Sequence, residues 1–244
     1  MDINFFIFFI FFCFLAVYLC RKYNLIVDYK IEKHKRFSTK LKSISIGGIL
    51  LIFFFSYQFV YVAPDILLLL LLFSILIIGL MSDIKKLNNV ALRFALQTLL
   101  IIFFISFLEV RIDITKINFI DKILENNFFN IFFVSFCLMV LINGANFIDG
   151  LNGLLIKYFL FVYLVIFYNF SHYATIDVNF LANLIMILLF ILILNLTGFI
   201  YMGDSGAYLL SLFTGIYLID FSSQNFSVSP YLVIVFLWYP CFEL

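Results

Sequence analysis

Long apolar runs alternate with short polar segments along almost the whole chain. A helical membrane span needs about 20 mainly apolar residues, with a range of about 17 to 25. The runs between polar breaks are candidate spans near residues 3–20, 44–62, 66–81, 92–108, 128–142, 154–170, 179–196, 207–220 and 230–244. No extended soluble segment and no internal repeat interrupts this pattern. The chain is therefore predicted to be an all-α, polytopic transmembrane helix bundle of about nine spans, with residues 1–244 forming a single integral-membrane domain.

The composition supports a membrane protein and excludes an ordinary soluble domain. Of the 244 residues, 66% are hydrophobic and 12% are charged, whereas a soluble domain is about half apolar and about a quarter charged. The first run is expected to be a retained span rather than a signal peptide, because no basic segment precedes it and no small-residue cleavage pattern follows it. The net charge of +1 gives no reason to expect a nucleic-acid partner.

Basic residues predict which side of the membrane each polar segment faces. Short loops rich in Lys and Arg lie on the cytoplasmic side, and the first loop holds eight of the fifteen basic residues. Alternation of the spans then places residues 82–92, 143–153 and 197–206 on the same cytoplasmic side. The segment 109–127, in which acidic and basic residues are mixed, is expected outside.

Three polar clusters fall on that cytoplasmic face, and each contains an aspartate where an apolar run meets a loop. The clusters read "GLMSDIKKLN", "NGANFIDGLNG" and "YMGDSGAYLL", and their acids are Asp83, Asp149 and Asp204. Ionisable groups at this depth are costly and usually line a water-filled cavity. Mg²⁺ prefers carboxylate and carbonyl oxygens and often shares them with substrate phosphates, while amides at glycine turns suit phosphate oxygens. The clusters together predict a metal-assisted phosphoryl-transfer site.

Each of these acids also has a structural interpretation. Asp83 is equally suited to cap a span, and Asp204 followed by Ser205 is good chemistry for the N-cap of a helix. In the second cluster, polar residues recur at every third position and form a drifting stripe on one helix, which is also typical of a small-residue packing motif. The stripe consists of Asn143, Asn146, Asp149 and Asn152.

At these residues the sequence resembles the polyprenyl-phosphate N-acetylhexosamine-1-phosphate transferases, the membrane family that includes phospho-N-acetylmuramoyl-pentapeptide transferase. The segment "NFIDGLNGL" resembles the family pattern N-F-x-D-G-x-D-G-L, and "YMGDSGAYLL" resembles F-M-G-D-x-G-S-x-x-x-G. The segment "GLMSDIKKLN", followed by Arg93 and Gln97, resembles G-x-x-D-D-x-x-x-L followed by a basic residue and Gln. "VDYKIEKHKRF" with the later Gly47–Gly48 pair resembles the basic segment near the second span.

The chain departs from the family pattern at several positions. Ser82 precedes Asp83 where the family has paired aspartates, and Asn152 replaces a second aspartate. Phe199 stands where a lysine is common. The sequence ends at "WYPCFEL", where the family continues into a cytoplasmic loop and further spans, so the resemblance implies a C-terminally incomplete member.

The resemblance implies an activity, a cofactor and partners. An N-acetylhexosamine-1-phosphate would pass from a UDP-sugar to undecaprenyl phosphate, with release of UMP, to start a cell-envelope polysaccharide such as lipopolysaccharide O-antigen. Mg²⁺ would be the cofactor, with Mn²⁺ as the alternative. The implied location is the bacterial inner membrane, among membrane lipids, and a homodimer is the implied assembly.

The resemblance also implies roles for individual residues. Asp204 would be the metal ligand, Asp83 would contact or deprotonate the lipid phosphate, and Asp149 would complete the catalytic acids. Substrate would be bound by residues from four segments: His34, Arg93, Asn146, Asn152 and Asn195. For His34, which lies in the basic first loop, contact with anionic lipid is the structural alternative.

Two other functions compete with the transferase. A transporter usually places its substrate near the bilayer midplane, often between internal repeats, whereas these clusters lie at span ends. A catalytically degenerate homologue that only binds a lipid or assembles with partner proteins is favoured by Ser82 and by the early end of the sequence. Convergence of Asp83, Asp149 and Asp204 at one level near the cytoplasmic face distinguishes a phosphate site from a transport path.

Overall fold

The computed structural model describes residues 3–26, 44–150, 153–173, 176–225 and 228–242. Within these ranges all the regular elements are helices. No strand is present there, and the β-type pairing is limited to an isolated bridge between Ser45 and Tyr201. The helices are α1 (Ile3–Lys22), α2 (Gly47–Tyr57) with its π-helical continuation η1 (Gln58–Val62), α3 (Ile66–Asp83), α4 (Val90–Leu108), α5 (Asn118–Leu124), α6 (Asn127–Ile148), α7 (Leu154–Phe170), α8 (Val178–Leu196), α9 (Gly203–Gln224) and α10 (Pro230–Phe242).

The nine predicted apolar runs all form helices. In the described part of the chain, six helices are long and apolar enough to cross a membrane: α1, α3, α4, α6, α8 and α9. Three shorter apolar helices cover Gly47–Val62, Leu154–Phe170 and Pro230–Phe242. The predicted all-α, polytopic bundle is confirmed.

The short helix α5 lies in the polar segment that sequence analysis treated as a loop. Its Asp121 accepts hydrogen bonds from the backbone N–H and the hydroxyl of Thr115, at 2.6 and 2.5 Å. Because these bonds stabilise the charged carboxylate, the pKa of Asp121 is lowered from its usual value. A seven-residue helix held by such local bonds has too short a pattern to be recognised in the sequence.

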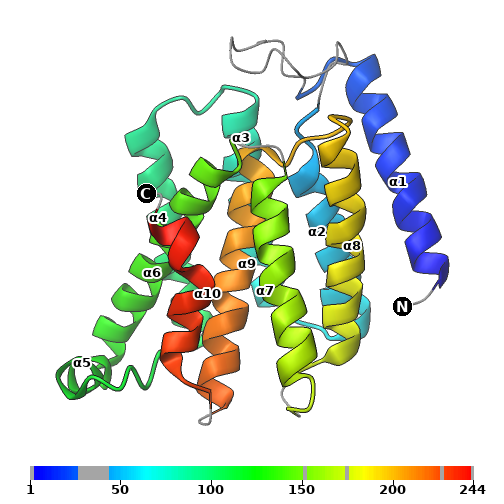
Figure 1. Ribbon diagram of the computed structural model, residues 1–244. Coiled ribbons are helices and arrows are strands. Elements are labelled where there is room, and N and C mark those ends of the chain that lie inside the picture. Colours follow the sequence, from blue (N-terminus) through cyan, green and yellow to red (C-terminus); the bar gives the residue numbers. More distant parts are fainter. Residues whose placement is uncertain (1–2, 27–43, 151–152, 174–175, 226–227, 243–244) are drawn as a thin grey trace.

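Helix α9 lies at the centre of the bundle and packs against α2, α3, α6 and α10 (Figure 1). It is the least apolar of the six long helices and the most buried of them. Small residues explain this combination, because they let neighbouring backbones approach closely. Gly48 of α2 and Gly79 of α3 both face Ser205, so closely that a Cβ on either glycine would come within 3.0 Å of Ser205 atoms.

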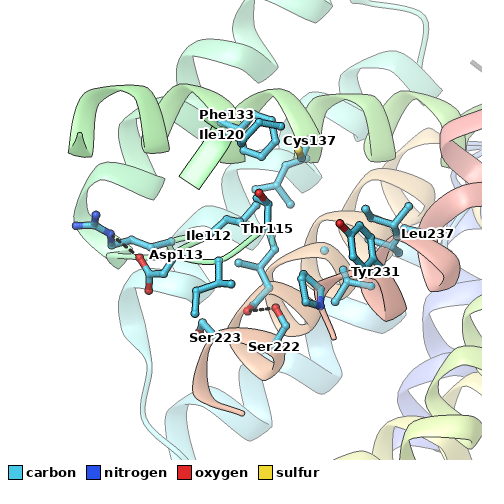
Figure 2. A pocket seen from close by; sticks show the side chains of 18 of the residues that line it. Ile112, Asp113, Thr115, Ile120, Phe133, Cys137, Ser222, Ser223, Tyr231 and Leu237 are labelled. Atoms are coloured by element: carbon cyan, nitrogen blue, oxygen red, sulfur yellow. Dashed lines mark hydrogen bonds and ion pairs between the residues drawn. The ribbon is translucent and has the colours of Figure 1, made fainter. Parts of the chain in front are cut away.

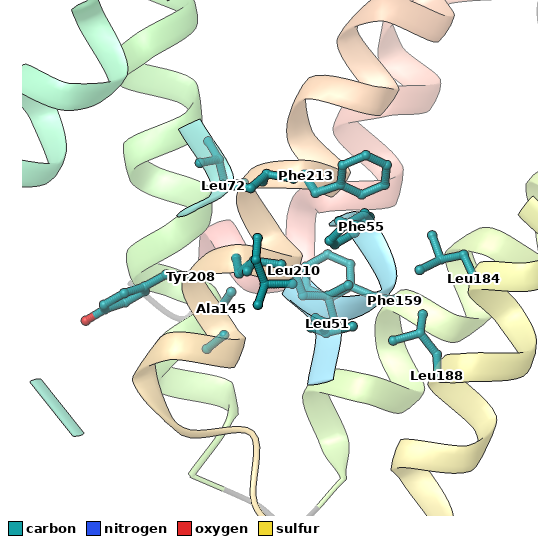
Figure 3. Packing of buried hydrophobic residues seen from close by; sticks show 14 of the residues in the cluster. Leu51, Phe55, Leu72, Ala145, Phe159, Leu184, Leu188, Tyr208, Leu210 and Phe213 are labelled. Atoms are coloured by element: carbon teal, nitrogen blue, oxygen red, sulfur yellow. The ribbon is translucent and has the colours of Figure 1, made fainter. Parts of the chain in front are cut away.

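The apolar core forms around α9, with residues from α2, α3, α6, α7 and α8. In Figure 3, Leu51 and Phe55 of α2 meet Leu210 and Phe213 of α9, and Phe159, Leu184 and Leu188 approach from α7 and α8. Tyr208 of α9 is different, because its ring extends away from this cluster and its hydroxyl points outward from it. The core therefore surrounds most of α9, and Tyr208 lies at the edge of the core with its hydroxyl directed out of it.

The predicted alternation of spans brings the three polar clusters to one end of the bundle. Figure 1 shows the ends of α3 and α6 and the starts of α7 and α9 along the same upper edge. Backbone hydrogen bonds join the segments there: the Tyr201 N–H donates to the Ile44 carbonyl at 2.8 Å, and the Gly47 N–H donates to the Tyr201 carbonyl at 3.0 Å. This edge is called the site end below.

Candidate active site

Asp83 is the last residue of α3, and its carboxylate caps the start of α9. The backbone N–H of Asp204 donates to its Oδ1 at 2.8 Å, and the N–H of Ser205 donates to its Oδ2 at 3.2 Å. Gly203 makes this possible, because a Cβ at that position would lie 2.8 Å from Asp83 Oδ1. The first N–H groups of a helix have no partner within the helix, and a carboxylate there also interacts favourably with the helix dipole.

Asp204 is not the N-cap of α9, so the structural interpretation of this residue is wrong. Asp204 lies inside the first turn of α9, and the residue at the N-cap position is Met202, which makes no side-chain capping bond. The cap comes instead from Asp83 on another helix. The side chain of Asp204 is therefore free for other contacts.

The carboxylate of Asp204 meets groups from α3 and α4. Its Oδ2 accepts a hydrogen bond from the Ser82 hydroxyl at 2.5 Å and lies 3.1 Å from Arg93 Nη1, which also donates to the Ser82 hydroxyl at 2.5 Å. Its Oδ1 makes no hydrogen bond with the described residues. The side chains of Arg93 and Asp204 are 19% and 30% exposed, so a ligand has access to this ion pair.

The second cluster joins this group through Asn146. Its side-chain Nδ2 donates to the Tyr208 hydroxyl at 3.4 Å. Asn146 lies one turn before Asp149, and Tyr208 lies one turn after Asp204, so all three acids lie at the site end. In the described ranges, however, no three side chains of Asp, Glu, His or Cys gather closely enough to hold a metal together. Asp149 is the C-cap residue of α6 and is half-buried.

The remaining predicted residues are distributed unevenly. Asn195 is buried near the end of α8, beside Gly153 at the start of α7. His34 and Asn152 lie outside the described residues. The structure thus brings together Asp83, Arg93 and Asp204, with Asn146 next to them through Tyr208.

Two residues of the site were not assigned a role from the sequence. Ser82 was noted as a departure from the family pattern, yet it bridges Arg93 and Asp204. Tyr208 is fully buried, and its ring lies 5.9 Å from the Arg93 guanidinium. The spacing of Asp204 and Tyr208, four residues apart on one helix, is the signal that predicts a shared face.

The donor set at Asp204 fits a divalent cation of the magnesium type. Mg²⁺ commonly binds a protein through one or two carboxylates and takes its other ligands from water and substrate phosphates. Asp204 Oδ1 is such a carboxylate oxygen, because it is partly exposed and forms no hydrogen bond within the described ranges.

An apolar cavity of about 360 Å³ lies towards the opposite end of the bundle (Figure 2). It is enclosed by α6, α9, α10 and the segment 111–117, with Phe133, Phe136 and Trp238 in its walls. None of the three aspartates lines it. Most of its lining is apolar, which suits a hydrocarbon chain. Among the described residues, charged side chains line it only along the segment 111–117, at Arg111, Asp113 and Lys116.

Comparison with known proteins gives one family. The model of glycosyl transferase family 4 matches residues 66–222, which is more than half of the chain and includes Asp83, Arg93, Asp149 and Asp204. No curated protein and no solved structure matches the chain.

Proposed function

Because the chain belongs to glycosyl transferase family 4, a family of membrane sugar-phosphate transferases, we propose that it transfers an N-acetylhexosamine-1-phosphate from a UDP-sugar to undecaprenyl phosphate. An oxygen of the lipid phosphate forms a bond to the phosphorus next to the sugar, and the bond from that phosphorus to UMP breaks. The observation that carries the proposal is the ion pair between Arg93 and Asp204 at one end of a helix bundle. Asp204 keeps one carboxylate oxygen, Oδ1, that forms no hydrogen bond with the described residues.

The location of the site agrees with the two substrates. A lipid phosphate is held at the membrane surface, and a nucleotide sugar arrives from the cytosol, which is the side predicted for the site end. Both substrates are polyanions, so catalysis depends on positioning them and on offsetting their charge. Arg93 supplies a fixed cation for this purpose. Mg²⁺, or Mn²⁺ in its place, would be held by Asp204 and would neutralise charge on the phosphate oxygens.

The two other aspartates have different proposed tasks. Asp83 holds the first turn of α9 and so fixes the position of Asp204. We propose that it also contacts or deprotonates the lipid phosphate, through the lone pairs that the two amides leave available. Asp149, with Asn146 on the same helix and Asn152 after it, is proposed to position the nucleotide. His34 and Asn195 stay proposals as further substrate-binding residues.

The apolar cavity is the proposed binding site for part of the prenyl chain. It extends along α6 and α9, the two helices whose ends carry Asn146 and Asp204. A chain lying there would be shielded from water, and burial of apolar area is worth roughly 25 cal/mol per Å². The proposed location is the bacterial inner membrane, and the proposed assembly is a homodimer. The product would start a cell-envelope polysaccharide such as O-antigen.

Membranes that contain the chain should make a lipid-linked sugar when given labelled UDP-N-acetylhexosamines, undecaprenyl phosphate and Mg²⁺. We expect labelled lipid and UMP in equal amounts, and loss of both when the divalent cation is chelated. Membranes without the chain are the control. If no UDP-N-acetylhexosamine gives a lipid product where a known relative is active, the transferase proposal is wrong.

Ser82 favours a second candidate function, a homologue that binds the lipid phosphate without transferring sugar. A hydroxyl in place of a carboxylate lowers the negative charge around Arg93. This candidate predicts that undecaprenyl phosphate binds while the assay above gives no product. A transporter, by contrast, predicts movement of substrate into vesicles without release of UMP.

Replacement of Ser82 by alanine removes the hydrogen bonds to Asp204 and from Arg93. At about 0.5 to 1.5 kcal/mol for each bond, kcat/KM is expected to fall about fivefold to a hundredfold. The direct contact of 3.1 Å between Arg93 and Asp204 would remain but lose the bridging hydroxyl. Initial rates at low substrate concentrations measure this effect. Ser74→Ala is the matched control, because Ser74 lies on the same helix and bonds only to its own turn, at Leu70. Equal rates for both variants would show that the Ser82 bridge is dispensable.

A further inference from the structure

Tyr208 is a buried aromatic residue with an unusual setting. It lies on α9, one turn after Asp204, and no part of it is exposed. Its ring lies at the edge of the apolar core, with the hydroxyl directed away from the other core residues (Figure 3). A buried tyrosine hydroxyl normally finds a hydrogen-bond partner, so the groups around it indicate its task.

Three polar side chains surround Tyr208, from two other helices. Asn146 of α6 donates to its hydroxyl at 3.4 Å. The guanidinium of Arg93, on α4, lies 5.9 Å from the ring centroid, within the range of a cation–π interaction. Gln97 lies one turn after Arg93 on the same helix and is fully buried next to the hydroxyl, and its amide atoms meet no hydrogen-bond geometry with the part of the chain that the structure describes. Tyr208 thus touches both the ion pair and the second polar cluster.

The contact with Tyr208 determines which atom of the Asn146 amide remains for a ligand. Asn143, one turn earlier, bonds back to its own helix at the Met139 carbonyl, at 2.8 Å. Asn146 instead reaches across to α9 with its Nδ2. Asn146 is half-buried, and its Oδ1 makes no hydrogen bond with the described residues. An amide oxygen accepts hydrogen bonds, so the ligand partner of this oxygen is an N–H or O–H group.

We propose that Tyr208 is a positioning residue. It orients the Asn146 side chain towards an N–H or O–H group of the nucleotide sugar while Arg93 contacts the phosphates. This inference rests on the proposed function. The hydroxyl acts on the nucleotide half of the site through Asn146, and the ring supports Arg93. Gln97 adds a second buried amide beside the hydroxyl, in addition to Asn146.

The test compares Tyr208→Phe with Tyr163→Phe in the full chain. Tyr208→Phe removes the hydroxyl and keeps the ring. We expect the dissociation constant for UDP and the KM for the UDP-sugar to rise about threefold to tenfold. The KM for undecaprenyl phosphate should stay within about twofold, because Arg93 keeps its ring contact. Tyr163 is the matched control, because it is also fully buried and its hydroxyl bonds to Thr214 at 2.7 Å, on the other side of the bundle.

A double-mutant cycle with Asn146→Ala tests whether Tyr208 acts through Asn146. If it does, Tyr208→Phe should not weaken UDP binding further once Asn146 is alanine, since coupled residues are not additive. Independent, additive effects would overturn the inference, as would UDP binding that is unchanged in Tyr208→Phe. A chain that neither binds UDP nor transfers sugar would overturn the proposed function as well, so the two failures are distinguishable.

Discussion

Replacement of Asp204 by asparagine is expected to lower the rate of sugar-phosphate transfer at least about a hundredfold, which is the size of effect seen when one preorganised charged or polar group is lost from a reacting centre. Asparagine keeps the shape of the side chain but removes its charge. Arg93 would then lose its negatively charged partner, and the side chain would no longer offer a carboxylate oxygen to a divalent cation. The measurement is kcat with saturating UDP-sugar and undecaprenyl phosphate.

The matched control for this variant is Asp220→Asn, on the same helix. Asp220 lies near the other end of α9, is exposed, and accepts a hydrogen bond from Gln224 at 2.7 Å. Its loss should leave kcat within about twofold, because surface polar contacts of this kind contribute little. Both variants should insert into the membrane as the unaltered chain does. Activity of Asp204→Asn within a few-fold of the unaltered chain would show that the metal ligand has been misidentified.

The spans of this protein could be predicted from the sequence because each depends on a local property. An apolar run of sufficient length forms a helix in lipid whatever its neighbours are, since every backbone group must be satisfied within the segment. The nine runs therefore correspond to nine apolar helices in the described part of the chain. The common end of the three polar clusters followed from alternation, and the structure confirms that arrangement.

The contacts inside the site could not be predicted in the same way, because they depend on how helices far apart in sequence pack. Asp83 caps a helix that begins 120 residues later, and nothing in its local sequence distinguishes that task from capping its own span. The Ser82 bridge and the contact between Asn146 and Tyr208 depend in the same way on the rotation of α3 and α6 against α9. A resemblance identifies the residues of a site but not the bonds between them.

The close approach of α3 and α9 leads to a prediction at Gly79, one turn before Asp83. A Cβ at Gly79 would lie 2.3 Å from the Ser205 Cα and 2.7 Å from the Ser205 N. Backbone atoms cannot turn aside as a side chain can, so Gly79→Ala must push the two helices apart. Such overpacking typically costs about 1 to 3 kcal/mol. The shift would also pull the Asp83 carboxylate from the amides of Asp204 and Ser205, so we expect a loss of activity of at least about tenfold, equal to about 1.4 kcal/mol in the transition state.

Gly215→Ala separates this effect from a general intolerance of larger residues on α9. A Cβ at Gly215 would meet the side-chain ends of Leu138 and Leu141, at 2.6 and 2.9 Å, and leucine ends can move into other rotamers. The thermal midpoint of the purified protein should fall by several degrees in Gly79→Ala, at about 2 to 4 °C per kcal/mol for a chain of this size, and by less in Gly215→Ala. The transfer rate should fall only in Gly79→Ala. If Gly79→Ala keeps both its midpoint and its rate, α3 and α9 are not in backbone contact, and Asp83 cannot be the cap that positions Asp204.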